Sequence, residues 1–221
     1  MTRRSLAQAT ETLDRRALGR PLCQVISEFH WRGWCLGTSG SFSLVVSRDP
    51  VWLLITRTGV DKARVDPESL VLVNADGEPA IGDPGTPSAK TILHCTIASV
   101  TGAGSVLHVH SVSDTLLGEH FAARGGFVVA GYEMLKGLEG MRSHEDRIFV
   151  PVLANSQDMV GLADEVSPML EREHGLRGFL LAGHGLWTWG ETLEEAKRHV
   201  EIFEFLFECL ARRTRFSPFT G

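Results

Sequence analysis

Apolar residues recur at three- and four-residue steps near the start of the chain, and this spacing predicts a helix. The stripe covers residues 22–29, with Pro21 suited to a first helical turn and Gly33 suited to a left-handed end. A second helix is expected over residues 88–100, after a loop rich in glycine and proline. Both helices should therefore bury one face against a core.

The clearest helix lies near the end of the chain, where apolar residues form one stripe over residues 193–210. Thr192 and Glu195 have the spacing of a capping box, which satisfies free backbone N–H groups at a helix start. We expect this helix to begin at that pair and to pack its apolar stripe on a sheet.

Short runs of β-branched and aromatic residues, bounded by glycine, proline and asparagine, predict strands between these helices. The expected strands are residues 42–46, 51–56, 69–73, 105–110, 126–130, 147–150 and 178–182. Helices and strands interleave irregularly and do not alternate as they do around a parallel sheet. We therefore expect an α/β fold, with a central, mostly antiparallel sheet flanked by helices.

Length and composition bound the organisation of the chain. The sequence has 221 residues, with no internal repeat, low-complexity tract or linker-like segment. A chain well short of roughly 300 residues favours one core, so we expect a single domain over residues 1–221. Hydrophobic residues make up 43% of the chain and charged residues 22%, which excludes the disordered and collagen-like classes.

Charge and apolar patterning exclude two classes of partner. The net charge is −5 and the 22 lysines and arginines are scattered, whereas a nucleic-acid-binding protein shows a basic stripe. No apolar run approaches the roughly 18 residues of a membrane span, and none follows residues 2–5 as a signal peptide requires. We expect a cytoplasmic protein that binds neither nucleic acid nor membrane.

Cysteine usage favours free thiols. Cys23, Cys35, Cys95 and Cys209 are far apart in the sequence and form no C-x-x-C pair. In a chain without an export signal, such cysteines are expected to be reduced. A structural zinc site made of cysteines is therefore not expected.

Histidines supply the first candidate for chemistry. His108 and His110 are two residues apart on an expected strand, so both imidazoles project from the same face. His184 lies between two glycines directly after another expected strand, where little side-chain bulk would block its approach to a metal. Three histidines with an open fourth position are typical of catalytic zinc. The alternative for each histidine is a hydrogen-bonded place in the core.

Glycine- and hydroxyl-rich segments supply a second candidate, an anion site. Residues 37–41, the Thr58–Gly59 pair and Ser88 lie in expected loops or at an expected helix start. Backbone N–H groups in such turns bind phosphate, and hydroxyls add donors. Turn formation and helix capping are the simpler explanation for any one segment. The pattern is neither a P-loop nor a dinucleotide motif, so it does not predict a nucleotide.

Two acids are candidates for proton transfer. Glu133 lies between two glycines after a hydrophobic strand, where a carboxylate near a metal but not bound to it could move protons. Glu145, in the segment 143–146, is a less specific candidate. Composition alone would make either residue a solvated surface acid.

Together these motifs resemble the class II, zinc-dependent aldolase family over roughly residues 20 to 210. The resemblance lies in the order of the glycine-rich loop, the Thr-Gly turn, the Pro-Ser-x₅-His helix, the His-x-His strand, Gly-His-Gly and the terminal helix. Residues 131–137, 143–145 and 151–158 are similar to the branch that dehydrates 5-methylthioribulose 1-phosphate in methionine salvage. The expected activity is that of a carbon–oxygen lyase.

The resemblance implies roles for particular residues. The zinc ligands, one ion per subunit, would be His108, His110 and His184, with Glu133 as the general acid/base. A phosphorylated sugar would be held through its phosphate, and the enzyme would be a homotetramer with active sites near subunit interfaces. Zinc would acidify the C3 proton of the substrate and the C4 hydroxyl would leave, giving 2,3-diketo-5-methylthiopentyl 1-phosphate. The implied phosphate contacts are Gly40, Ser41, Thr58, Gly59 and Ser88.

Two positions depart from the family pattern. Ser41 stands where relatives usually carry asparagine, and Lys90 stands where many carry a glutamate beside the metal. In the aldolases that glutamate is the catalytic acid/base, so Lys90 keeps three alternatives open: an outward lysine, a phosphate-binding lysine or an impaired site. The alternative functions are a sugar-phosphate aldolase or epimerase, and a relative with a scaffold role.

Overall fold

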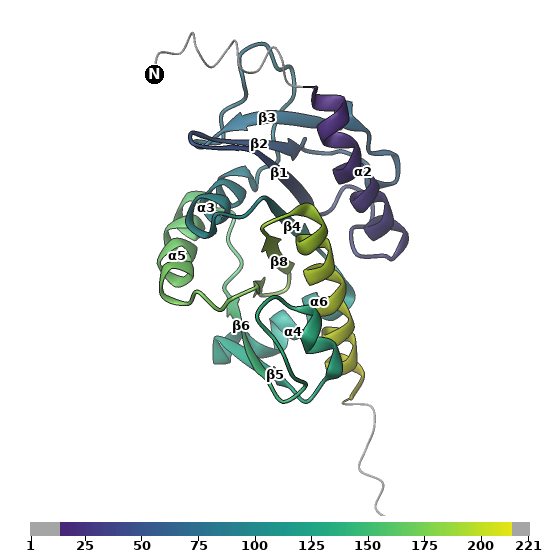
Figure 1. Cartoon of the computed structure of the whole chain (residues 1–221), viewed down its shortest axis with the longest axis vertical. Coiled ribbons are helices and arrows are strands. Elements are labelled where there is room, and N and C mark those ends of the chain that lie inside the picture. Colours follow the sequence, from purple (N-terminus) through teal and green to yellow (C-terminus); the bar gives the residue numbers. More distant parts are fainter. Residues whose placement is uncertain (1–13, 214–221) are drawn as a thin grey trace, which may run out of the picture.

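The computed structural model describes residues 14–213, so the segment 2–5 lies outside the described residues. Figure 1 shows its helices and strands. The helices are α2 (Arg15–Trp31), α3 (Thr91–Thr101), α4 (Val112–Phe121), α5 (Met159–Arg172) and α6 (Leu193–Arg213). The strands are β1 (Ser41–Arg48), β2 (Val51–Thr56), β3 (Leu70–Asn74), β4 (Ser105–Val109), β5 (Gly126–Ala130), β6 (Arg147–Leu153), β7 (Gly178–Leu181) and β8 (Gly185–Gly190). Short 3₁₀ turns include η1 (Lys62–Arg64) and η4 (Glu133–Gly137).

All eight strands belong to one sheet, in the order β3-β2-β1-β4-β8-β7-β6-β5. Every neighbouring pair is antiparallel except β6 and β7, which run parallel. The expected α/β fold with a mostly antiparallel sheet is therefore confirmed. The single domain over residues 1–221 stays a prediction.

Helices cover both faces of the sheet (Figure 1). On one face, α3 and α5 pack on a cluster that contains Val106 of β4 and Trp187 of β8. On the other face, α2 and α6 pack on a cluster that contains Leu107 and Val109. Side chains alternate along β4, so His108 shares the face of α3 and α5.

Helix boundaries differ from the expected ones for local reasons. Helix α2 begins at Arg15 because the side chain of Asp14 accepts hydrogen bonds from two backbone N–H groups of the first turn. Pro21 consequently lies inside α2 and not in its first turn. Helix α3 begins at Thr91, three residues after Ser88, whose hydroxyl instead accepts the N–H of Lys90.

Two expectations from composition can be compared with the described residues. All four cysteines are free in the structure, as expected. Within residues 14–213, no helix is long and apolar enough to cross a membrane.

Candidate metal centre

The register of three strands places His108 at the centre of the site. His108 on β4 lies opposite Ser41, the first residue of β1, and opposite Trp187 of β8. The rings of His108 and Trp187 are stacked, with their centroids 4.2 Å apart. His110 follows the end of β4, and His184 lies in the turn that joins β7 to β8. The site is therefore at the edge of the sheet where β4 ends and β1 begins.

The three histidines converge on one point. Nε2 of His108 is 2.8 Å from Nε2 of His110 and 3.3 Å from Nε2 of His184, and one ring nitrogen from each histidine lies within 4.8 Å of the others. Nitrogens that share a tetrahedral zinc at 2.0–2.1 Å are about 3.3 Å apart. The arrangement could therefore hold a metal ion.

Hydrogen bonds to the other ring nitrogens orient two of these imidazoles. Nδ1 of His108 is 2.9 Å from the carbonyl oxygen of Leu186, and Nδ1 of His184 is 3.1 Å from Oδ1 of Asn155. Oxygen acceptors at these positions require the proton on Nδ1, which leaves each Nε2 with a lone pair directed into the cluster. Such partners fix the tautomer that a metal requires.

Burial keeps the cluster uncharged. Desolvation, followed by the mutual proximity of the rings, lowers the pKa of His108 well below its usual value. Burial lowers the pKa of His110 and of His184 to about 4. All three imidazoles are thus neutral near pH 7, the form in which histidine binds metals.

Close backbone contacts require glycine at two positions around the cluster. A Cβ atom at Gly40 would lie 2.8 Å from the carbonyl oxygen of His108, and the φ angle of Gly40 is +77°. A Cβ atom at Gly185 would lie 2.1 Å from the carbonyl oxygen of Val109. Side chains at these positions would push β1 and β8 away from the histidine-bearing strand.

The three segments expected to bind phosphate are joined by hydrogen bonds. The backbone N–H of Thr58 donates to Thr86 at 3.1 Å, and that of Ser88 donates to Thr56 at 3.2 Å. The N–H of Lys62 donates to Gly37 at 3.0 Å, which ties the turn after β2 to the loop before β1. The structure therefore brings these segments together, and phosphate binding by them stays a prediction.

The hydroxyl of Ser41 is already engaged. Its Oγ is 2.8 Å from Nε2 of His94, a fully buried histidine of α3, while Nδ1 of His94 lies 2.8 Å from Oγ of Ser43. The Ser43 hydroxyl donates to the carbonyl oxygen of Val106 at 3.4 Å, so it accepts from Nδ1 of His94, and the Ser41 hydroxyl in turn donates to Nε2. On this assignment a phosphate at this loop would rely on backbone N–H groups and not on the Ser41 hydroxyl.

The charge of Lys90 helps to keep two histidines of the cluster neutral. Its positive charge is among the causes that lower the pKa of both His110 and His184, and burial lowers the pKa of Lys90 itself. Lys90 is half-buried at the N-terminal end of α3. The three alternatives for Lys90 therefore all stay predictions.

Glu133 lies at the other end of the sheet. It follows β5, whose last residue Ala130 pairs with Arg147 at the start of β6, whereas the histidine cluster is at the end where β6 finishes. Strand β6 has 7 residues, so these ends are about 20 Å apart at roughly 3.3 Å per residue. Glu133 is exposed and forms an ion pair with Lys136. Glu145 belongs to the same end, because the carbonyl oxygen of the preceding His144 accepts the backbone N–H of Gly131 at 2.9 Å.

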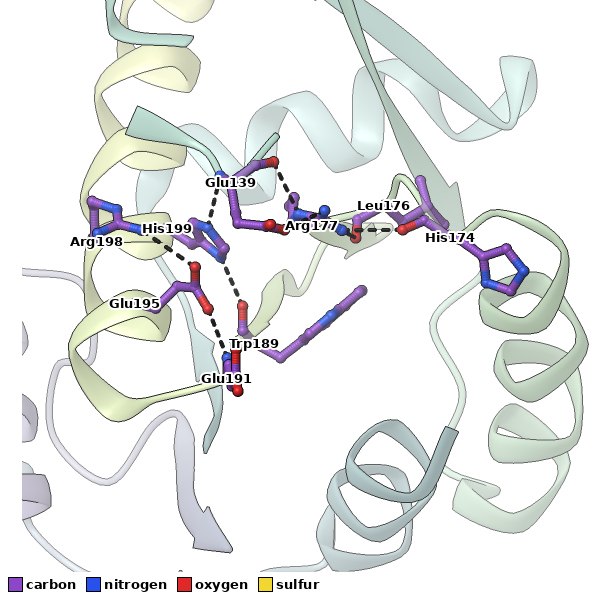
Figure 2. A network of polar contacts seen from close by, with 9 residues as sticks. All are labelled: Glu139, His174, Leu176, Arg177, Trp189, Glu191, Glu195, Arg198 and His199. Carbon is purple, nitrogen blue, oxygen red and sulfur yellow. Dashed lines mark hydrogen bonds and ion pairs between the residues drawn. The ribbon is translucent and has the colours of Figure 1, made fainter. Parts of the chain in front are cut away.

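A polar network fixes the segment after Glu133 against α6 and β8 (Figure 2). His199 of α6 accepts the backbone N–H of Glu139 at 3.1 Å and donates to the carbonyl of Trp189 at 2.7 Å. Arg177 donates to the carbonyl of Glu139 at 3.1 Å and forms an ion pair with its carboxylate. The segment that carries Glu133 is thus held in place by its own chain.

Sequence reasoning missed three residues of the site. Asn155 orients His184, His94 engages Ser41, and Lys62 joins two loops. Asn155 lies within the 151–158 motif and His94 ends the Pro-Ser-x₅-His motif, so both could have been singled out there. No local signal marks Lys62, because one of its two acceptors, the carbonyl of Thr38, is brought near only by the fold.

Comparisons with known proteins agree with this arrangement. Residues 20–211 match the description "Class II Aldolase and Adducin N-terminal domain". Methylthioribulose-1-phosphate dehydratase from Picosynechococcus sp. is 39% identical over 209 residues, which cover 94% of this chain and 97% of that protein. The protein of the same name from Xanthomonas campestris is 41% identical over 185 residues, 83% of each chain.

Solved structures include the same fold. The L-fuculose-1-phosphate aldolase from Thermus thermophilus superimposes with a TM-score of 0.69 and is 26% identical, covering 87% of this chain and 92% of that one. The resemblance noted from the sequence motifs is thus confirmed over most of the chain. This chain belongs to the class II aldolase and adducin N-terminal domain family.

Proposed function

We propose that this chain is a zinc-dependent methylthioribulose-1-phosphate dehydratase of methionine salvage. It would remove water from 5-methylthioribulose 1-phosphate to give 2,3-diketo-5-methylthiopentyl 1-phosphate. The observation that carries the proposal is the convergence of three neutral imidazoles on one point. Relatives of this name at 39–41% identity over most of both chains support the choice of reaction.

His108, His110 and His184 would hold the metal through Nε2, and a bound zinc ion would supply the Lewis acidity that makes the C3 proton removable. Leu186 and Asn155 keep two of the imidazoles oriented. Backbone N–H groups of the loop 37–41 and the turn 58–59 would hold the phosphate, so that the sugar carbons are fixed relative to the histidines.

Glu133 would accept the proton that leaves C3, and the geometry of the sheet determines which copy's metal centre it serves. Its hydrogen bond with Lys136 lowers the pKa of Glu133, so the carboxylate is ionised and able to accept a proton. Because Glu133 and the histidines of one chain lie at opposite ends of the sheet, Glu133 would serve the histidine cluster of a neighbouring copy. This arrangement supports the expected active sites near subunit interfaces, and the homotetramer is part of the proposal.

The test is turnover of the substrate by the purified, zinc-loaded protein. A dehydratase gives a diketone lighter than the substrate by one water, with all carbons retained. An aldolase would instead give two fragments, and an epimerase would give an isomer of unchanged mass. No turnover, together with less than stoichiometric zinc, would overturn the proposal in favour of a scaffold role.

A further inference from the structure

Lys62 is a buried cation at the base of the candidate phosphate site. The residue is 1% exposed, although lysine is rarely buried without a partner. Its Nζ donates to the carbonyl oxygens of Thr38 at 3.2 Å and Val60 at 3.0 Å. One N–H of the ammonium group therefore has no acceptor among residues 14–213.

This ammonium group lacks a counter-ion in the described part of the chain. Its two acceptors are carbonyl oxygens, and the carboxylate of Asp61 acts on it only as a longer-range charge. Burial lowers the pKa of Lys62, which reflects the unfavourable free energy of a poorly compensated buried charge. An anion bound nearby would offset that cost.

The ammonium group of Lys62 contacts both of the segments that are expected to bind phosphate. Thr38 belongs to the loop 37–41, and Val60 directly follows the Thr58–Gly59 turn, so one ammonium group holds both segments. The loop 37–41 leads into β1, whose first residue Ser41 lies opposite His108, so the loop that Lys62 holds borders the metal centre. A ligand held by the two turns would therefore lie next to this cation.

We propose that Lys62 is the cationic residue of the phosphate subsite: it holds both turns and supplies the charge that selects a phosphorylated substrate. The proposal deepens the proposed function and rests on it for the identity of the substrate class. An alternative is that Lys62 only ties the two loops together. The two roles differ in one respect, because only the first predicts that the ammonium group responds to phosphate.

The first experiment measures the affinity of the zinc-loaded protein for inorganic phosphate by calorimetry at fixed ionic strength. Lys62→Met is expected to weaken binding at least about tenfold, whereas Lys197→Met, at a surface ion pair with Glu28, should leave it unchanged. Zinc content and melting temperature are recorded to show that each variant is folded. Phosphate binding by folded Lys62→Met within twofold of the parent would overturn the proposal.

A second measurement needs no change at Lys62 and covers the case in which Lys62→Met fails to fold. The chain has four lysines, at positions 62, 90, 136 and 197, so ¹⁵N-lysine labelling gives few ammonium signals, assigned by Lys→Arg at the other three. Inorganic phosphate is expected to shift the Lys62 signal and leave that of Lys197 in place. No shift of the Lys62 signal at saturating phosphate would overturn the proposal and show that Lys62 only joins the two loops.

These readouts are independent of dehydration. A protein that binds phosphate through Lys62 and does not dehydrate the sugar would contradict the proposed function alone. A protein that dehydrates the sugar and shows an unresponsive Lys62 would contradict the role of Lys62 alone.

Discussion

His184 is the histidine that the sequence pattern alone placed least firmly, because it lies 74 positions after His110 and reaches the site only through the β7–β8 turn. His184→Ala should lose most of the bound metal and nearly all activity, since two imidazoles and water cannot replace a third fixed ligand. Metal content after dialysis measures the effect. Full zinc retention by the variant would show that the ligand assignment is wrong.

Lys90 supplies the second prediction for a single residue. A unit charge about 5 Å from a divalent ion interacts with it by about 6.6 kcal/mol at an effective dielectric constant of 20, and lysine opposes the ion where glutamate attracts it. On the impaired-site alternative, Lys90→Glu should tighten zinc binding and raise dehydration at least about tenfold. Competition with a zinc chelator and initial rates measure the two effects.

The matched control for this change is Lys90→Gln, which removes the charge without reversing it and should fall between the parent and Lys90→Glu. Equal zinc affinity and equal turnover in the parent and in Lys90→Glu would exclude the impaired site. A phosphate-binding Lys90 predicts the opposite sign for substrate, because Lys90→Glu would then raise KM.

The sequence predicts the role of a single residue well only when its partners are close to it along the chain. His108 and His110 follow from strand alternation, and the structure brings them together as that pattern predicts. Ser41 is different, since its hydroxyl is engaged by His94, 53 positions later, and no local pattern marks that pairing. Sequence motifs could therefore indicate the loop 37–41, but not which of its hydrogen-bond donors remain available.

At the scale of elements, two buried acids join α4 to α6. The carboxyl groups of Asp114 and Glu204 lie next to each other, and each has one buried oxygen without a hydrogen-bond partner among the described residues. Burial raises the pKa of Asp114 to about 6 and raises that of Glu204 well above its usual value. A proton shared between the two carboxyl groups satisfies both oxygens.

This pair should make stability depend on pH. Carboxyl groups have a pKa of about 4 in the unfolded chain, so the folded state binds more protons, and the stability present below about pH 4 is lost as pH rises through about 6. Asp114→Asn keeps the shape and removes one acid, so the variant should gain stability relative to the parent at pH 8 but not at pH 4. The difference accumulates at up to about 1.4 kcal/mol per pH unit.

Denaturant unfolding between pH 4 and 8.5 measures this dependence. Glu194→Gln, at an exposed position in the first turn of α6, is the control and should leave the slope of stability against pH unchanged. Parallel curves for the parent and Asp114→Asn would contradict a shared proton between α4 and α6.

The elements themselves were predicted unevenly. Strands β2 and β5 match their expected bounds because apolar runs end at clear turn residues. Helix α4 was not expected, since Val112 is exposed, Gly118 lies in its interior and its apolar residues form no single stripe. Strand β8 is buried along its whole length and shows no alternation of polar and apolar residues, so its sequence lacks the usual signal of a strand.

At the scale of the whole molecule, the strand order decides which residues can meet. The sequence placed Glu133 after a strand, which the structure confirms, but strand order and direction depend on contacts between distant segments. Strands β8, β7 and β6 lie between β4 and β5 in the sheet, and β5 ends away from the histidines. Proximity of Glu133 to a metal centre therefore requires a second copy of the chain.

This geometry leads to a prediction for the proposed oligomer. Glu133→Gln should keep zinc and fold while dehydration falls about 10²- to 10⁴-fold, because the amide keeps the shape of the side chain and cannot accept the proton. His184→Ala should be inactive for lack of metal. Oligomers that contain both variants should regain activity, since an intact Glu133 from one copy can face an intact histidine cluster of the other.

The mixed oligomers are prepared by co-expression with two different affinity tags and purified through both tags in turn. Each variant alone, carried through the same steps, is the control and should stay inactive. If Glu133 served the cluster of its own chain, every subunit in the mixture would carry one defect and no activity would return. Turnover of Glu133→Gln within about threefold of the parent would instead remove Glu133 as the acid/base and make Glu145, which lies at the same end of the sheet, the next residue to test.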